Sequence, residues 1–147
     1  ADAAQMRALL LREKPPKGEF DLKLARGGMI DVEFIAQTAQ LIAGPERPEI
    51  FAAATLEALK RLGNIGALAA DDARALGRAY LLFTQVNHVL RLTSDDDAAA
   101  VTEAGQQRLL TRACGAAGFD EVEDRIESAK ADVAKRFDRL VGVPTQV

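Results

Sequence analysis

Four ionisable side chains lie close together in the sequence around a pair of glycines. Lys23 and Arg26 come just before Gly27-Gly28, and Asp31 and Glu33 follow where a helix is predicted to begin. Two adjacent glycines allow positive φ and close backbone approach, so they predict a constrained bend. This bend would bring two cations, two carboxylates and a helix N-terminus within a few residues of one another.

The bend allows two interpretations, one structural and one chemical. In the first, the glycines form a turn, and each carboxylate near the positive end of the helix dipole stabilises the helix by roughly 0.3–1 kcal/mol. In the second, the bend faces a nucleotide or a metal–phosphate group, with Lys23 and Arg26 as phosphate contacts. Spacing alone favours the structural interpretation, because short glycine motifs are weak signals. A Walker phosphate-binding loop is excluded, since no Gly-Lys-Ser/Thr follows the glycines.

The wider segment, residues 21–37, reads D-L-K-L-A-R-G-G-M-I-D-V-E-F-I-A-Q. It closely resembles the segment that opens the helical domain after each nucleotidyltransferase domain of bacterial glutamine synthetase adenylyltransferase/deadenylase. The family pattern there is roughly D-[IL]-K-x-x-x-G-G-[IL]-x-[DE]-[IV]-E-F-x-x-Q. Its polar, glycine and aromatic positions are met by Asp21, Lys23, Gly27, Gly28, Asp31, Glu33, Phe34 and Gln37.

Flanking segments support the resemblance. They are M-R-A-L-L-L-R-E-K-P-P-K-G at residues 6–18 and L-K-R-L-G-N-I-G-A-L at residues 59–68. The match is specific over residues 6–92 and generic beyond them. The wording G-G-M-I-D-V-E-F resembles the C-terminal, adenylylating half of the family, because the other half tends to carry Glu at the position of Asp31.

The resemblance implies the C-terminal helical domain of an enzyme that transfers AMP from ATP to a tyrosine of glutamine synthetase, regulating nitrogen assimilation. It implies ATP and Mg²⁺ as cofactors of the full-length enzyme. The implied partners are an upstream nucleotidyltransferase domain, glutamine synthetase and the PII regulatory protein. The candidate nucleotide-binding residues are Lys23, Arg26, Gly27, Gly28, Asp31, Glu33 and Gln37.

Within the family, the catalytic metal ligands are expected to lie outside this chain. Two-metal nucleotidyl transfer needs carboxylates that hold Mg²⁺, and the family's Gly-Ser and Asp-x-Asp signature is missing here. The triplet at residues 95–97, Asp-Asp-Asp, does not follow a Gly-Ser turn and is interpreted as a solvated helix end. We therefore expect no catalytic residue, metal ligand or cofactor of its own in this chain, and no transferase activity from it alone. The bend would instead pack against the upstream domain, with Lys23 and Arg26 offering positive charge to the triphosphate and Asp31 and Glu33 fixing the corner.

Two alternatives stay open. The chain could be the related helical domain of a PII uridylyltransferase-like enzyme. It could also be a non-enzymatic interaction module, with the long helix and a polar stripe of Glu33, Gln37 and Gln40 as its docking surface. These three residues are neighbours on one helical face at spacings of three and four.

Composition narrows the class of protein. At 147 residues the chain fits one domain, and its abundance of Ala and Leu with no Trp favours helix over sheet. The net charge of −3 argues against general nucleic-acid binding. A single cysteine, Cys114, excludes an internal disulfide and fits a reducing, cytoplasmic location. No apolar run approaches the roughly 18 residues needed to span a membrane, and no signal peptide opens the chain. The absence of an initiator Met suggests a fragment of something longer.

The pattern of apolar residues predicts an all-α bundle of five to six mostly antiparallel helices. We expect one domain over 1–147, with a connecting helix and loop at 1–19 and the bundle at 20–147. Helices are predicted over 2–13, 30–43, 49–62, 71–92, 103–117 and from 120 to a stop at Gly142. A short extended piece is expected at 22–24, and a capping-box-like start of the last helix at Asp120 and Glu123. The expected core stripes are Ala73, Leu76, Tyr80, Phe83, Asn87 and Leu90 in the longest helix, and Val122, Ile126, Ala129, Val133, Phe137 and Leu140 in the last.

Overall fold

The computed structural model describes residues 2–43, 54–93 and 101–142, and within these ranges it contains six α-helices and no strand. The helices are α1 (Asp2–Glu13), α2 (Met29–Ala43), α3 (Thr55–Asn64), α4 (Ala70–Thr93), α5 (Ala104–Ala113) and α6 (Phe119–Leu140). The predicted all-α bundle is confirmed.

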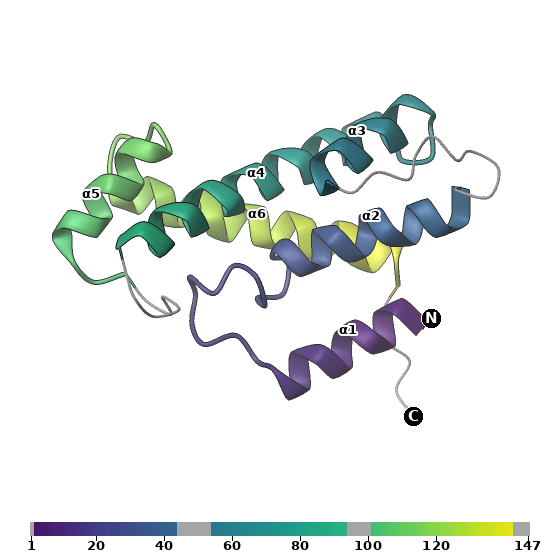
Figure 1. Cartoon of the computed structure of the whole chain (residues 1–147), viewed down its shortest axis with the longest axis horizontal. Coiled ribbons are helices and arrows are strands. Elements are labelled where there is room, and N and C mark those ends of the chain that lie inside the picture. Colours follow the sequence, from purple (N-terminus) through teal and green to yellow (C-terminus); the bar gives the residue numbers. More distant parts are fainter. Residues whose placement is uncertain (1, 44–53, 94–100, 143–147) are drawn as a thin grey trace.

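The helices are organised around α4, the longest of them (Figure 1). α3 runs back along the first half of α4 as a helical hairpin, while α2 and α6 pack on α4 and on each other. α5 packs against α4 and α6 at the opposite end of the bundle from α3 (Figure 1). Among the described helices, α1 packs only on α2. The long 14–28 segment connects these two helices and brings the glycine pair to the start of α2.

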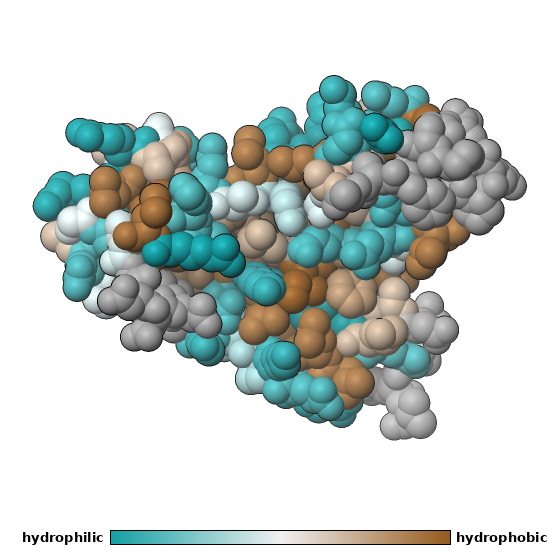
Figure 2. Space-filling view, in the orientation of Figure 1, coloured by the Kyte–Doolittle hydropathy of each residue, from teal (hydrophilic) through white to brown (hydrophobic). Residues whose placement is uncertain are grey.

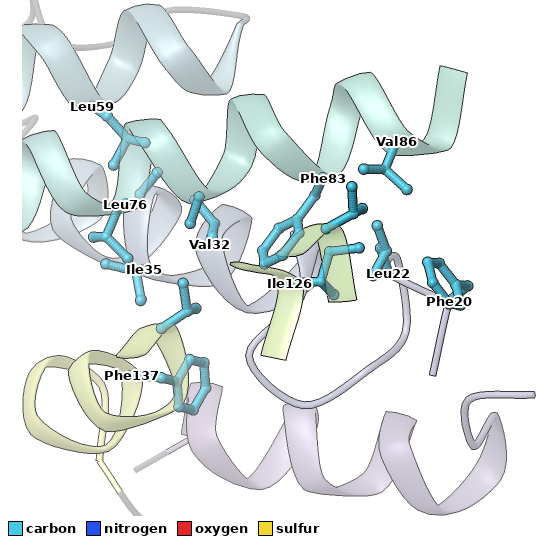
Figure 3. Packing of buried hydrophobic residues seen from close by; sticks show 14 of the residues in the cluster. Phe20, Leu22, Val32, Ile35, Leu59, Leu76, Phe83, Val86, Ile126 and Phe137 are labelled. Atoms are coloured by element: carbon cyan, nitrogen blue, oxygen red, sulfur yellow. The ribbon is translucent and has the colours of Figure 1, made fainter. Parts of the chain in front are cut away.

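One contiguous core joins all the helices except α1 (Figure 3). Its centre is Phe83 of α4, which is completely buried and lies among Val32, Leu22 and Ile126 in the close-up view. These neighbours come from α2, from the connector before it and from α6. The connector is therefore part of the core and does not run over its surface.

The predicted stripe of α6 is confirmed, and that of α4 is too narrow. Val122, Ile126, Val133 and Phe137 are buried, with Ala129 and Leu140 packed partly buried beside them. In α4 the buried side chains are Asp72, Ala75, Leu76, Ala79, Phe83, Val86 and Leu90. Ala73, Tyr80 and Asn87 of the predicted stripe are only partly buried. The buried face is wider than one seam because α2, α3, α5 and α6 surround α4 on several sides.

Three local predictions differ from the structure. The 22–24 piece is a turn and not extended, because the N–H of Ala25 donates to the carbonyl of Asp21 at 3.0 Å. α5 ends at Ala113, four residues earlier than predicted, in a turn through Cys114 and a glycine. Burial raises the pKa of the Cys114 thiol in that turn.

The third difference concerns the start of α6. Its N-cap is Gly118 and not Asp120, and no side chain caps it. Glu121 reaches back instead, and its carboxylate accepts the backbone N–H of Ala117 at 2.6 Å. Of the predicted 49–62 helix, the part from residue 55 is observed and continues to Asn64. Residues 49–53 and the acidic triplet at 95–97 lie outside the described residues.

An ion cluster around the buried Asp72 joins α4 to α6. Asp72, in the first turn of α4, accepts hydrogen bonds from both Arg136 and Arg139 of α6, and its side chain is 4% exposed. Arg136 also donates to Asp132 of its own helix at 2.9 Å. The Arg139 hydrogen bond lowers the pKa of Asp72 against the opposing effect of burial, and the hydrogen bond from Arg136 lowers it further.

The lowered pKa of Asp72 predicts how the stability of the fold depends on pH. The folded-state pKa of Asp72 lies below its unfolded value, so the stabilisation is complete above the ordinary carboxyl range and is lost as the pH falls through the folded pKa. Asp72→Asn should lower the free energy of unfolding by about 1–3 kcal/mol near neutral pH. It should also flatten the fall in stability between about pH 5 and pH 2, as measured by urea unfolding.

Asp71→Asn is the matched control, since Asp71 is the preceding residue and its side chain is 73% exposed. Its effect should stay within about 0.5 kcal/mol. Equal effects of the two variants would contradict a special role for the buried carboxylate.

Candidate functional site

The bend before α2 is a compact turn that satisfies the first N–H groups of the helix. The carbonyl of Leu22 accepts the N–H of Met29 at 2.8 Å, and that of Lys23 accepts the N–H of Ile30 at 3.2 Å. The N–H of Gly28 donates to the carbonyl of Ala25 at 2.9 Å. Helix N-termini normally leave such donors open to capping groups or anions. Here carbonyl groups of the connector accept the N–H groups at the start of α2.

A buried carboxylate holds the bend together. Asp31, with a side chain only 2% exposed, accepts hydrogen bonds from the backbone N–H of Gly27 and from Nε of Arg7 in α1. The Arg7 guanidinium, 5% exposed, also donates through Nη2 to the carbonyls of Leu24 at 2.9 Å and Ala25 at 3.1 Å. One ion pair therefore ties together α1, the bend and the first turn of α2.

The two glycines differ in conformation: the sequence allows positive φ at both, but only Gly27 has it. Gly27 has a φ of +78° and lies against α6, where an added Cβ would be 1.9 Å from the carbonyl oxygen of Lys130. Gly28 does not have positive φ; an added Cβ there would be 2.1 Å from the carbonyl oxygen of Leu22. Substitution at Gly28 is therefore opposed by close backbone approach and not by its φ.

Two further contacts fix the connector to α6. Arg26 donates through Nη2 to a carboxylate oxygen of Asp138 at 2.6 Å, with both side chains well exposed. Lys130 donates through Nζ to the carbonyl oxygen of Glu19 at 2.9 Å. Arg26 is therefore already engaged at the surface of the bundle.

The remaining predicted site residues lie at different depths. Lys23 is exposed, and no acidic partner for it appears among the described residues. Glu33 is partly buried beside Tyr80, whose pKa is raised by burial and by the nearby carboxylate. Gln37 is exposed and Gln40 is buried, so the predicted polar stripe of α2 does not present a single open face.

Arg7 is the residue that sequence reasoning missed. Arg7 lies in the 6–18 segment that supported the resemblance. It is 24 residues from Asp31, however, and no helical or strand periodicity links residues so far apart. The available clue was indirect: an acid at a position that must be buried needs a cation or several donors nearby.

The bend alone does not fit a nucleotide with its metal. Its backbone N–H groups are taken by internal acceptors, and Asp31 is taken by Arg7. Within the described ranges, no group of three or more His, Cys, Asp or Glu side chains is placed to hold a metal ion. What fits a phosphate is the open cation Lys23, together with Arg26 if Asp138 releases it.

A family model described as GlnD PII-uridylyltransferase matches residues 3–141, almost the whole chain. The chain belongs to this family. The match includes α1 with Arg7, the bend, and all of α6. No helix among the described residues has the combination of length and apolar character that crossing a membrane requires.

Similar curated proteins narrow the relationship within the GlnD PII-uridylyltransferase family. The bifunctional glutamine synthetase adenylyltransferase/adenylyl-removing enzyme of Rhodopseudomonas palustris strain HaA2 is 38% identical over 143 residues, which is 96% of this chain. The enzyme of the same name from Bradyrhizobium diazoefficiens is 34% identical over 95% of the chain. That from Rhizobium meliloti strain 1021 is 44% identical over 99 residues, 65% of the chain. The resemblance drawn from the 21–37 motif is confirmed.

This chain spans only a small part of those relatives. The matches cover 14% of the length of the Rhodopseudomonas palustris and Bradyrhizobium diazoefficiens proteins and 10% of the Rhizobium meliloti protein.

The close approach of Gly27 to α6 gives a prediction with a matched control. Gly66 has the same φ of +78°, but an added Cβ there would meet nothing within 4 Å. Gly66→Ala should therefore cost only the backbone strain, about 1–2 kcal/mol. Gly27→Ala adds a backbone clash and should lower the free energy of unfolding by more than about 3 kcal/mol, or prevent folding. Urea unfolding measures both, and equal losses would contradict the packing of the bend on α6.

Proposed function

We propose that this chain is a helical domain of a glutamine synthetase adenylyltransferase/adenylyl-removing enzyme, following a nucleotidyltransferase domain. The observation that carries the proposal is 38% identity over 96% of the chain to an enzyme of that name. The complete 21–37 motif supports it, since its glycines, Asp31 and Phe34 occupy the turn and first half of α2. As implied by the motif, the full-length enzyme transfers AMP from ATP to a tyrosine of glutamine synthetase in the cytoplasm, under control of PII. The wording around Asp31 favours the adenylylating half.

In this proposal the bend is a rigid edge and not a self-contained active site. The Arg7–Asp31 pair and the two glycines fix its backbone, so the outward direction of Lys23 and Arg26 is set by the fold. Packed against a catalytic domain, this edge would place one or two cations beside the phosphates of ATP bound there. Charge-assisted hydrogen bonds from such cations stabilise bound phosphate.

The reaction itself would use residues outside this chain. ATP supplies the adenylyl group and Mg²⁺ neutralises its phosphates in the full-length enzyme. The residues of this chain would bind and orient: Lys23 donates toward phosphate oxygen, Glu33 and Gln37 line the neighbouring turns of α2, and Asp31 keeps the bend closed. None of them is placed to activate the attacking tyrosine.

Substitution of Lys23 and Arg26 in the full-length enzyme tests this role. Lys23→Ala should raise the ATP concentration needed for half-maximal adenylylation by about ten-fold, the effect of losing one charge-assisted hydrogen bond. Stability should be unchanged because the Lys23 side chain is exposed. Arg26→Ala should have a similar effect on ATP if the guanidinium leaves Asp138 to meet phosphate.

Asp138→Asn separates two roles for Arg26. If Arg26 serves the nucleotide, freeing it from Asp138 should leave the ATP requirement unchanged or lower it. If Arg26 only holds the connector against α6, Arg26→Ala and Asp138→Asn should lower the free energy of unfolding equally. Neither variant should then change the ATP concentration needed for half-maximal adenylylation. An unchanged ATP dependence in the Lys23 variant would remove the bend from the nucleotide site.

The purified 147-residue chain should show no AMP transfer to glutamine synthetase. We expect this because the Gly-Ser and Asp-x-Asp signature is missing from its sequence. Radiolabelled ATP with Mg²⁺ and glutamine synthetase is the assay, and the full-length enzyme is the positive control. Incorporation of label by the isolated chain above the no-enzyme background would contradict the proposal.

A second candidate function rests on the description of the matching family. The model described as GlnD PII-uridylyltransferase spans residues 3–141, which favours a PII-modifying enzyme as the alternative. The two candidate enzymes differ in the protein that they modify and in the nucleotide that they use. Incubation of the full-length enzyme with ATP or UTP, and with glutamine synthetase or PII, separates them. Adenylylated glutamine synthetase supports the first candidate, and uridylylated PII supports the second.

A further inference from the structure

A surface groove lies between α3 and α4, away from the bend. It has a volume of about 460 Å³ and is lined by residues of both helices, among them Leu56, Lys60 and Gly63 of α3 and Arg74, Gly77 and Arg78 of α4. The residues recur at spacings of three and four on both helices, so one face of each helix forms one wall. Lining residues 70–81 of α4 extend over roughly 17 Å, about three helical turns.

The floor of the groove is made of small residues, and the helices touch there. An added Cβ on Gly63 would lie 2.8 Å from Cβ of Ala73, so this glycine is needed for the contact between α3 and α4. Leu56 and Leu81 provide apolar surface that is 40% and 47% exposed. Hydrophobic side chains also reach the surface over α4 along the upper edge of the molecule in Figure 2.

Packing among the described residues does not explain Gly77. It lies in the interior of the 24-residue α4, and an added Cβ there would meet nothing within 4 Å. Glycine in a helix interior lowers the folding equilibrium constant by about two- to five-fold relative to alanine. Because glycine has no side chain, the groove is deeper at this position, and the backbone of a bound segment can come closer to α4.

The charges around the groove all have one sign. Lys60 on the α3 side and Arg74 and Arg78 on the α4 side line it, and no acidic residue does. Among the described residues, Lys60 and Arg78 have no ion-pair partner, and Arg74 lies 4.0 Å from Asp71 with both side chains exposed. Cations on both edges of an apolar floor complement an occupant with an apolar stripe flanked by acids on both sides.

We propose that the α3/α4 groove binds an acidic amphipathic helix of a partner protein. A third helix laid along two antiparallel helices would bury Leu56 and Leu81 and place its small or apolar residues over Gly77. Its flanking Glu and Asp side chains would meet Lys60 on one edge and Arg74 and Arg78 on the other. In this helix-in-groove mode of binding, apolar residues of the partner helix, three and four positions apart, fit into the groove. It goes beyond the proposed adenylyltransferase role and does not depend on it.

A second copy of this chain is a poorer occupant. α6 has more acidic residues than any other described helix, but its apolar face is already buried through Val122, Ile126, Val133 and Phe137. Self-association is therefore an outcome that the test must distinguish.

The test uses a synthetic stapled helix of about 14 residues, roughly 21 Å long, with a leucine stripe flanked by glutamates. Its fluorescein anisotropy is measured against the protein. The control peptide carries lysine in place of each glutamate. The acidic helix should bind about ten-fold more tightly than the lysine version at low salt, as three exposed charge pairs predict. The difference should shrink as salt is raised.

Two pairs of variants locate the binding. Gly77→Leu fills the floor and should weaken binding of the acidic helix more than ten-fold, with the circular dichroism spectrum unchanged. Gly105→Leu, at an exposed helical glycine of α5, should leave binding unchanged. Lys60→Glu with Arg78→Glu should abolish the preference for the acidic helix, whereas Arg108→Glu with Arg112→Glu, an equal change of charge on α5, should preserve it.

Gly77→Ala adds a readout that a purely structural glycine would not show. It should raise the folding equilibrium constant by about two- to five-fold in urea unfolding and still weaken binding of the acidic helix. Equal affinity for the acidic and lysine helices would overturn the proposal, as would unchanged binding in Gly77→Leu. Dimerisation of the protein by analytical ultracentrifugation that Gly77→Leu abolishes would also overturn it, in favour of a second copy.

Discussion

The buried ion pair between Arg7 and Asp31 is the interaction on which the candidate site depends. Removing two charges from water is unfavourable unless both are paired and hydrogen-bonded. Here Asp31 is satisfied by Arg7 and by the Gly27 amide. Arg7 also donates through Nη2 to two connector carbonyls, whereas its buried Nη1 has no hydrogen-bond partner among the described residues. The pair links α1 to the bend and to α2, which is the one described helix on which α1 packs.

The pair also decides what the bend can do. Because the corner uses its own amides and its own carboxylate, it offers no ready-made anion pocket at the start of α2. The positive charge that reaches solvent is carried by Lys23, with Arg26 held beside it by Asp138. The bend is thus a rigid structural turn, as its spacing favoured, with the cation Lys23 on its exposed side. Under the proposed function, this turn would lie at the border with a catalytic domain, where small displacements of a charge affect the reaction.

Much of the fold could be predicted from the sequence, because helical periodicity and Gly/Pro stops are local signals. The stripe of α6 and the bounds of α2 and α4 are examples, within one or two residues. The contacts of the site could not be predicted in the same way. Arg7 and Asp138 lie 24 and 112 residues from their partners, and no spacing rule reports such pairs. Nor does the sequence say which of two adjacent glycines takes positive φ, since that depends on the position of α6.

A double-mutant cycle on the buried pair tests the central claim most directly. Arg7→Met, Asp31→Asn and the double variant are unfolded in urea, and their free energies of unfolding are compared with that of the parent protein. Each single variant leaves a buried group unpaired and should lose about 3–5 kcal/mol. The double variant should lose clearly less than the sum, with a coupling of about 2 kcal/mol or more. Additive losses, or single losses below about 1 kcal/mol, would show that the bend is held by other contacts.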